Sequence, residues 1–380
     1  MHHPRHPGRR HRPGRAAAAG GVKRPPHHPV TVADVGGTHL RWARWSPDGG
    51  LGEVHTTPSP GHARRPGAGA ADLQAELIRE LASRVEPGAR AGVSLGAAMD
   101  HHSGTAYASA PLWGPQVSPF DVPAALRAAR PDVHWTVVND VTAGLLHLAE
   151  MVRDAGVRKA CLVTISTGIA CRTMDLRTGG IPVDAAGLQG EIGHLPATVL
   201  ADGVPVVTRC DCGEPGHVAA SSSGPGIRRV AAVLARRDPA TWAGSGPTTR
   251  MMAGSGFEDA FRAALDDGDP VAADLLTAVT APIADLLRTA LCLDPELDLI
   301  ALTGGVAHGL EPHYSAAVHD HLRRRGLYLT SEREPDWLTG RIRVVPPATA
   351  DPLVGAGLAA LAAGPVPAYS GGGREALVGR

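Results

Sequence analysis

An asparagine and an aspartate stand together where two predicted elements meet. The segment 133–138 is rich in valine and predicts a strand, and leucines at helical spacing follow Asn139 and Asp140. A carboxylate at a strand end can take the proton of a substrate hydroxyl, and a carboxamide can orient hydroxyls because it both donates and accepts. We therefore expect Asp140 to be a general base and Asn139 to bind the substrate. The alternative for Asp140 is a helix N-cap, because it stands where the helix begins.

Three glycine-containing turns each follow a predicted strand, at 36–38, 166–168 and 303–305. Backbone N–H groups at such turns can approach an anion closely, since glycine has no Cβ. Asp34 can hold Mg²⁺ through water, and the hydroxyl of Thr38 can contact a phosphate oxygen. One such turn is explained equally well as a plain Gly-Gly hairpin, whereas three together favour a site for a nucleotide phosphate tail. The candidate phosphate-binding residues are Asp34, Gly36, Gly37, Thr38, Ser166, Thr167, Gly168, Gly304 and Gly305.

The elements that must position these residues alternate between strands and helices. This alternation predicts an α/β fold with a largely parallel inner sheet, in which ligands bind at the carboxyl ends of the strands. Two glycine-turn hairpins, at 30–45 and 160–175, each begin one part of the chain and predict two lobes. Gly, Thr and Met are frequent between 238 and 256, and we expect a loop there. Further strands are predicted at 91–96, 133–138 and 299–302, and helices at 73–85 and 270–287.

Length and composition limit the class of protein. The 380 residues suffice for two domains, and a formal net charge of zero argues against a nucleic-acid-binding body. No apolar run approaches the roughly 18 residues of a membrane span, so we expect neither a nucleic-acid nor a membrane partner. The five cysteines fit a reducing cytoplasm or a metal site better than a disulfide framework. We expect residues 1–28 to form a disordered basic tail, or alternatively a nucleic-acid-binding arm, and residues 364–380 to be flexible.

The order of the motifs resembles the ROK family, the glucokinase-like branch of the actin/hexokinase superfamily, from about Val30 to Ala363. The resemblance implies a two-lobed, ribonuclease-H-like α/β fold with the active site in the cleft between the lobes. It implies a small lobe at 29–140, a large lobe at 141–350 and a closing helix at 351–363 that packs back on the small lobe. It also implies a polyol substrate, ATP and Mg²⁺ as cofactors, and a homodimer. The matching segments are Asp34–Thr38, Asn139–Asp140, Ser166–Ile169, Glu191–His194, Cys210–Gly216, Ser223–Gly224, Thr303–Gly305 and Asp351–Ala356.

Two of these segments bear on substrate and metal binding. The Glu-x-Gly-His motif binds sugar in the family, which implies that Glu191 and His194 bind hydroxyls here. The family holds zinc with one His and three Cys, which implies His194, Cys210 and Cys212 as ligands. His217 stands at the position of the third cysteine, and imidazole is also a good zinc ligand, so we expect structural Zn²⁺ in a two-His, two-Cys site. The alternative is a tight loop without metal.

The segment 96–114 is where the family lines its sugar site. Here Asp100 can face a hydroxyl or fix a turn, and the two interpretations have equal weight. Trp113 can lie under the substrate ring or belong to the core.

Other residues of this resemblance bear on which polyol is phosphorylated. Ala219 stands where the family has a glutamate that binds a sugar hydroxyl, and a methyl group cannot accept that hydrogen bond. Ala219, His217 and the hairpin 35–42 together resemble the corresponding residues of kinases that phosphorylate C7-cyclitols in the biosynthesis of pseudo-oligosaccharide antibiotics. This implies an ATP-dependent 7-kinase acting on valienone or 2-epi-5-epi-valiolone. The alternatives are a hexose kinase of the glucokinase or N-acetylmannosamine kinase type and a sugar-sensing transcriptional regulator, against which the Pro-rich composition before Val30 argues.

Overall fold

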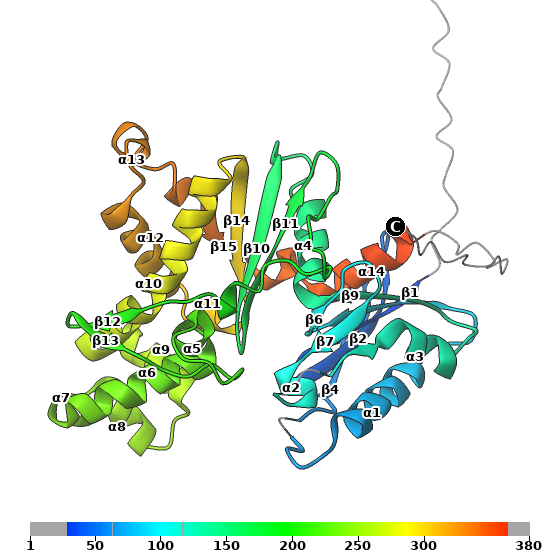
Figure 1. Cartoon of the computed structure of the whole chain (residues 1–380), viewed down its shortest axis with the longest axis horizontal. Helices are drawn as coiled ribbons and strands as arrows, with labels where there is room; N and C mark the ends of the chain where they lie inside the picture. Colours follow the sequence, from blue (N-terminus) through cyan, green and yellow to red (C-terminus); the bar gives the residue numbers. More distant parts are fainter. Residues whose placement is uncertain (1–28, 63, 116–117, 364–380) are drawn as a thin grey trace, which may run out of the picture.

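The computed structural model describes residues 29–62, 64–115 and 118–363, which form two lobes side by side (Figure 1). Each lobe is built on its own β-sheet, and helices α4 (Asp140–Met151) and α14 (Pro352–Ala362) lie between the two sheets. The two-lobed α/β architecture predicted from the sequence is confirmed. The segments predicted to be a disordered basic tail (1–28) and a flexible tail (364–380) lie outside the described residues.

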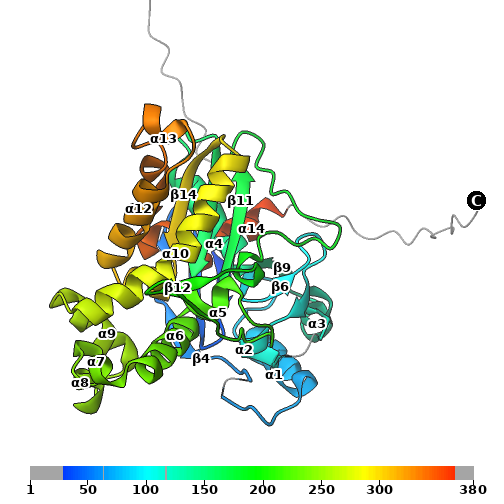
Figure 2. The same cartoon turned by 60° about the vertical axis from the view of Figure 1, so that its left-hand side comes forward.

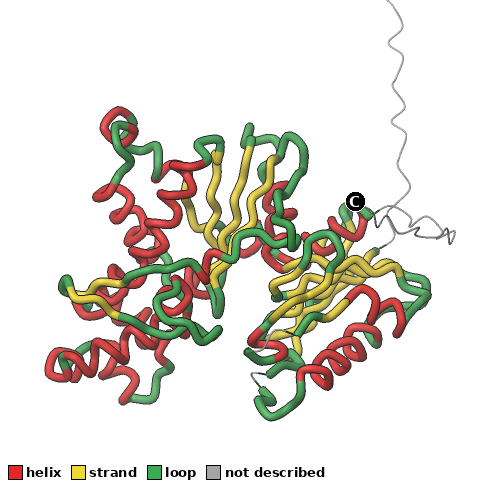
Figure 3. Tube along the Cα trace, viewed as in Figure 1, coloured by secondary structure: helices red, strands yellow, loops and turns green. Residues whose placement is uncertain are grey.

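Six strands form the sheet of the first lobe: β1 (Val30–Val35), β2 (His39–Ser46), β3 (Gly50–Leu51), β4 (His55–Pro58), β5 (Arg90–Leu95) and β9 (His134–Asn139). The order is β3-β2-β1-β5-β9, and β4 pairs with β2. β1, β5 and β9 are parallel, whereas β2 returns antiparallel to β1 through the first glycine turn. Helices α1 (Ala70–Ala82) and α3 (Val122–Ala129) cover one face with leucines and valines, and α14 covers the other (Figure 3).

Four strands form the sheet of the second lobe: β10 (Lys159–Ile165), β11 (Ile169–Asp175), β14 (Leu297–Thr303) and β15 (Ile342–Val344). The order is β11-β10-β14-β15, with β10, β14 and β15 parallel and β11 antiparallel to β10. Helices α10 (Pro270–Leu293) and α12 (His313–Arg325) pack on the face away from the first lobe, as Figure 2 shows. Helix α4 packs on the opposite face.

The remaining elements surround the two sheets. Short strands form a three-stranded sheet in the first lobe and a hairpin in the second. The predicted loop at 238–256 is wrong, because Asp238 and Ser245 cap two short helices, α7 and α8. The full set of elements outside the two main sheets and the helices named above is β6 (Ala98–Met99), β7 (Thr105–Ala108), β8 (Phe120–Asp121), β12 (Val199–Ala201), β13 (Val204–Val206), α2 (Ala110–Trp113), α5 (Val218–Ser222), α6 (Gly224–Arg237), α7 (Pro239–Ala243), α8 (Gly246–Met252), α9 (Phe257–Asp266), α11 (Gly305–Gly309), α13 (Thr330–Arg333), and the 3₁₀ turns η1 (Ile192–His194), η2 (Thr339–Arg341) and η3 (Pro347–Thr349).

Glycines allow α14 to approach its neighbours closely. A Cβ at Gly355 would lie 1.7 Å from the carbonyl oxygen of Ala143 in α4. A Cβ at Gly92 of β5 would lie 2.1 Å from the carbonyl oxygen of Ala356. Both positions require glycine, because any side chain there would overlap backbone atoms. Helix α14 therefore packs on the first sheet and on α4 at once, and it fixes the position of the helix that begins at Asp140.

Helix α10 is apolar over most of its length. By length and apolar content it is, among the described helices, long enough to cross a membrane. More than half of its most apolar stretch is buried within the protein. Leu275, Ile283 and Leu291 lie in the core of the second lobe, so the apolar character of α10 is explained by packing.

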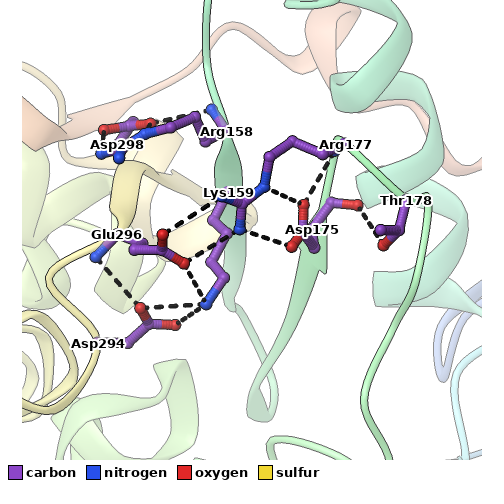
Figure 4. Close-up of polar contacts among 8 residues, drawn as sticks. All are labelled: Arg158, Lys159, Asp175, Arg177, Thr178, Asp294, Glu296 and Asp298. Atoms are coloured by element: carbon purple, nitrogen blue, oxygen red, sulfur yellow. Dashed lines mark hydrogen bonds and ion pairs between the residues drawn. The ribbon is translucent and has the colours of Figure 1, made fainter.

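Charged side chains gather at the end of the second sheet where β10 and β14 begin (Figure 4). Arg158 pairs with Asp298, and Lys159 pairs with Asp294 and Glu296. Arg177 bridges Asp175 and Glu296 across the strands. We call this group the far-end cluster: Arg158, Lys159, Asp175, Arg177, Asp294, Glu296 and Asp298.

Candidate active site

Strand β9 ends and helix α4 begins at Asn139 and Asp140. The Oδ1 atom of Asn139 accepts hydrogen bonds from the N–H groups of Val141 (3.0 Å) and Thr142 (3.2 Å), and its Nδ2 donates to the carbonyl oxygen of Ala97 (2.9 Å). The alternative interpretation of Asp140 as the N-cap is wrong, since Asn139 caps the helix. One N–H of the Asn139 carboxamide makes no other hydrogen bond to the described residues and can face a substrate.

The carboxylate of Asp140 lies among other charged side chains. Burial and the carboxylates of Asp34 and Glu191 raise the pKa of Asp140 to about 7, although a backbone hydrogen bond and Arg172 act to lower it. Gly96 lies directly beside it, because a Cβ there would be 3.4 Å from Oδ2 of Asp140. A carboxyl group that is half ionised near neutral pH can take a proton from a hydroxyl and later release it.

Asp34, near the end of β1, is held by side chains from two other elements. Oγ of Ser94 donates to Oδ1 of Asp34 (2.7 Å), and Arg41 donates to Oδ2 through Nε (3.1 Å) and Nη2 (2.8 Å). Arg41 also pairs with Asp351 (3.2 Å), which caps α14. Because a carboxylate has about four lone-pair positions, Asp34 can still accept hydrogen bonds from water on a metal ion. This fits an indirect role toward Mg²⁺ better than direct coordination.

The first glycine turn is tightly fixed but keeps an exposed surface. The N–H of Gly36 donates to the carbonyl oxygen of His39 (3.0 Å), and Oγ of Ser59 donates to the carbonyl oxygen of Gly36 (2.6 Å). Gly37 abuts α2, since a Cβ there would lie 2.4 Å from Cβ of Pro111. Thr38 is exposed. The turn is therefore rigid before any ligand arrives, with its outer face open to solvent.

The second and third glycine turns lie next to each other at the carboxyl ends of β10 and β14. Gly304 has φ of +103°, and a Cβ there would lie 2.5 Å from the carbonyl oxygen of Ile165, so only glycine fits. The N–H of Gly224, where α6 begins, donates to the carbonyl oxygen of Ser166 (2.9 Å). Thr167, Gly168 and Gly305 are exposed. Within the described residues, no hydrogen bond joins these two turns to the first one.

The carboxylate of Glu191 comes from the segment between β11 and η1, which contacts both lobes. Two residues of the first lobe donate hydrogen bonds to this segment. The N–H of His101 donates to the carbonyl oxygen of Gly187 (2.9 Å), and the hydroxyl of Tyr107 donates to the carbonyl oxygen of Ala186 (3.0 Å). On the second lobe, Arg172 pairs with Oε1 of Glu191 (3.4 Å). Sequence reasoning missed Arg172, although an arginine inside an apolar strand is a signal that could have identified it.

The four predicted zinc ligands come together. The ligand atoms of His194, Cys210, Cys212 and His217 all lie within 4.8 Å of one another. Sγ of Cys212 is 3.4 Å from Nδ1 of His217, a separation that tetrahedral Zn²⁺ ligation, with roughly 2.3 Å to sulfur and 2.0 Å to nitrogen, would give. Backbone bridges between Pro196 and His217 hold the two histidine-bearing segments together. The donor set and spacing therefore fit zinc.

Three neighbouring residues bear on the substrate site, and for two of them, Asp100 and Trp113, the sequence left alternatives open. Ala219 is buried against Gly193, whose Cβ position lies 3.3 Å from the Ala219 methyl carbon, and presents no polar atom to the site. Asp100 accepts hydrogen bonds from the N–H of His102 and from Ser103, so it fixes a turn. Trp113 is buried with its ring edge-on to Phe120, which places it in the core.

The sequence of the chain matches one known family over most of its length. A model described as "ROK family" matches residues 31–331 of this chain. The chain belongs to the ROK family. Among curated proteins, this ROK protein is 31% identical over 317 residues to a C(7)-cyclitol 7-kinase of Streptomyces hygroscopicus subsp. jinggangensis (strain 5008), with 79% of this chain and 85% of the relative covered. A C(7)-cyclitol 7-kinase from subsp. limoneus gives the same identity and coverage.

Solved structures of other ROK proteins share the fold. A ROK glucokinase from Streptomyces griseus, in complex with glucose and AMPPNP, gives a TM-score of 0.62 at 17% identity over 87% of this chain and 98% of that one. A ROK transcriptional regulator, a homologue of the E. coli MLC protein, gives 0.65 at 19% identity over 88% and 78%. Such identities show the fold alone. They confirm the predicted actin/hexokinase-like fold of this ROK protein.

Proposed function

We propose that this ROK protein is an ATP-dependent kinase for the primary hydroxyl of a C7-cyclitol, either valienone or 2-epi-5-epi-valiolone. The observation that carries the proposal is the 31% identity over 317 residues to two kinases named for a C7-cyclitol and its position 7. The buried alanine at 219 agrees with it, because it removes a polar group that a hexose site would use.

Asp140 is the general base of the proposed reaction. A primary hydroxyl is a weak nucleophile at neutral pH, and loss of its proton as the phosphoryl group arrives makes the attack easier. Asp140 lies at the start of α4, where Asn139 fixes the backbone and one carboxamide N–H can orient a neighbouring hydroxyl. A pKa near 7 suits this role, since the group is substantially ionised at neutral pH yet still basic enough to accept the proton.

The three glycine turns would hold ATP, which supplies the phosphoryl group and binds together with Mg²⁺. Their exposed backbone lies at strand ends, where N–H groups can face phosphate oxygens. Thr38 and Thr167 are exposed and can donate hydroxyl hydrogen bonds to the same oxygens. Asp34, held by Arg41 and Ser94, would orient water on the metal ion.

Zinc in this proposal is structural. His194 would use one ring nitrogen for the metal and leave the other for a substrate hydroxyl, since the two nitrogens are distinct. Cys210 and Cys212 lie on a tight turn closed by the hydrogen bond from the N–H of Gly213 to the carbonyl oxygen of Cys210 (2.9 Å). The metal would thus orient the wall of the site that carries Glu191 and His194.

An ADP-release assay with a panel of acceptors tests the proposal. The panel contains valienone, 2-epi-5-epi-valiolone, glucose and N-acetylmannosamine, and mass spectrometry with ³¹P NMR locates the phosphate. We expect the highest kcat/KM with a C7-cyclitol and phosphate on its exocyclic hydroxyl. A preference for glucose or N-acetylmannosamine would favour the hexose-kinase alternative. Binding of DNA without any acceptor-dependent ADP release would favour the regulator.

Two further properties belong to this proposal. None of the five cysteines of the chain is in a disulfide, which fits a protein of a reducing cytoplasm. We also propose a homodimer, as the family resemblance implies. Light scattering of the purified protein measures the latter directly.

A further inference from the structure

Arg172 is the one arginine, lysine, aspartate or glutamate that is fully buried in the part of the chain that the structure describes. Its side chain is 4% exposed. It lies on β11, and Ala170 and Met174, which share its side of the strand, pack in the core formed with α4. Arg172 therefore faces the helix whose first residue is Asp140. A buried guanidinium is costly unless opposite charges and acceptors surround it, so its position calls for an explanation.

The hydrogen bonds of Arg172 all go to one short stretch of chain and to its own strand. Nη1 donates to the carbonyl oxygens of Cys171 (2.8 Å) and Gln189, and Nη2 pairs with Oε1 of Glu191 (3.4 Å). The stretch 189–191 also pairs with β11 through its backbone, because the N–H of Cys171 donates to the carbonyl oxygen of Gly190 (2.8 Å). Arg172 thus connects the strand to the segment that carries Glu191.

Gly190 explains why this arrangement is so close. Its φ is +70°, and a Cβ there would lie 2.1 Å from the carbonyl oxygen of Cys171. The side-chain amide of Gln189 accepts from the N–H of Thr173 (2.7 Å). The segment therefore lies along β11 as an added edge, and the guanidinium of Arg172 donates to one carbonyl oxygen of the strand and to one of the segment.

We propose that Arg172 is a positioning residue of the active site, which holds Glu191 toward the acceptor and provides the positive charge that faces Asp140. This inference rests on the proposed function, in which Asp140 and Glu191 act on a polyol. Asp34 on β1, Glu191 and Arg172 are the charged groups that act on Asp140 from the surrounding elements. Two of these three groups are negative, so Arg172 is the counter-charge on that side of the carboxylate.

Four variants separate the charge of Arg172 from its hydrogen bonds. R172Q removes both, and R172K keeps the charge but not the planar fork of donors. E191Q removes the neighbouring negative charge. R177Q is the matched control, because Arg177 follows the same strand, pairs with two carboxylates and lies in the far-end cluster. The measurement is kcat and KM for the cyclitol from pH 5 to 9, with circular dichroism to verify folding.

We expect R172Q to raise the KM for the acceptor about tenfold and to move the acidic limb of kcat/KM upward, by on the order of one pH unit. R172K should raise KM while leaving the limb near its wild-type position. E191Q should raise KM and move the limb downward, and R177Q should change neither. A loss of rate in R172Q with KM and the limb both unchanged would contradict the inference, because it would indicate a purely structural role.

A second measurement does not depend on catalysis. In protein labelled with ¹³C at aspartate carboxyl groups, the resonance that is absent from D140N belongs to Asp140, and its titration can be followed without substrate. We expect a higher midpoint in R172Q than in the wild type and in R177Q. An identical midpoint would overturn the inference even if the wild type phosphorylated every acceptor. A wild-type chain inactive on all polyols would instead contradict the proposed function, and the titration would still test Arg172.

Discussion

The pKa values of carboxyl groups are shifted in opposite directions at the two ends of strands β10, β11 and β14. At the far-end cluster, three cations and four carboxylates pair with one another on the protein surface, and hydrogen bonds from Arg177 and Arg158 lower the pKa values of Asp175 and Asp298 to about 2. Beyond the opposite end, at the junction with α4, burial and other carboxylates raise the pKa of Asp140 to about 7. The carboxylates of the far-end cluster are each paired with a cation, whereas Asp140 is kept from full ionisation.

This difference indicates which end performs chemistry and which end holds the fold together. A carboxylate paired with arginine is too weak a base to take a proton from a hydroxyl. A carboxylate with a pKa near the working pH can do so. The glycine turns lie at the strand ends near Asp140, where backbone N–H groups are exposed, while the far-end cluster has none of these turns.

The largest expected effect comes from D140N. Loss of the base should lower kcat by about 10²- to 10⁴-fold with little change in the affinity for ATP. The matched control is D175N in the far-end cluster, which should leave kcat unchanged. At pH 8 D140N should unfold at the same temperature as the wild type or higher, because the ionised form of Asp140 is the one that burial disfavours. Near-normal turnover in a folded D140N would remove Asp140 from its role.

The pH dependence of the reaction gives the next largest effect. The base must be ionised, so log kcat/KM should rise with unit slope as pH increases toward about 7 and become level above it. At pH 5 the rate should therefore be about 100-fold below the plateau. The measurement is initial ADP release from pH 5 to 9 in overlapping buffers. A limb near pH 4 would show that Asp140 behaves as an ordinary exposed carboxyl group and would remove the contrast between the two ends.

The position of the candidate base could be predicted from sequence because it depends on local pattern. A valine-rich strand, an Asn-Asp pair and a leucine-spaced helix are adjacent in the chain, so Asp140 follows directly from them. Each glycine turn could likewise be predicted from residues that are adjacent in the chain. The arginine within the apolar strand β11 is a local signal, but its partners could not be found this way, because Gln189 and Glu191 return to β11 only after a loop.

Other errors have the same origin. Asn139, rather than Asp140, caps α4, because the choice between two adjacent polar residues depends on the backbone angles of the strand end. The helices α7 and α8 were missed, since each is a single turn or two with a capping Asp238 or Ser245 and little apolar periodicity.

Metal removal gives an intermediate effect at the catalytic end. We expect one zinc per chain in the wild type and in C292S, whose cysteine is exposed and outside the cluster, but much less in C210S. Loss of zinc should raise the KM for the polyol about 10- to 100-fold, since ligand-orienting contacts are lost, with a smaller effect on the KM for ATP. Elemental analysis and kinetics on the same samples measure both.

Chelation should affect the two ends of the second sheet differently. The far-end cluster contains none of the four predicted zinc ligands, so a chelator should leave its contribution to stability intact. Wild-type protein with well under one zinc per chain, yet with an unchanged KM after chelation, would contradict the metal site. His194 and His217 would then serve the substrate directly or only the fold.

The smallest expected effect is that of D298N, which breaks one pair of the far-end cluster. Asp298 accepts hydrogen bonds from the backbone N–H, Nε and Nη2 of Arg158, each at 2.9 Å. We expect D298N to lower the free energy of unfolding by about 1 kcal/mol at pH 7, because the pair is bidentate but partly exposed. Turnover should not change, since the cluster lies at the opposite end of the strands from the glycine turns.

The pH dependence of that loss distinguishes an ion pair from simple packing. A carboxyl group whose pKa is lowered to about 2 in the folded state stabilises the fold fully above its unfolded value of about 4, and the contribution disappears as pH falls through about 2. Urea unfolding of wild type and D298N at pH 7, 5, 4 and 3 should therefore show a constant difference down to about pH 5 and a shrinking one below pH 4. A difference independent of pH would assign the effect to packing, and any loss of kcat in D298N would mean that the two ends of the sheet are not independent.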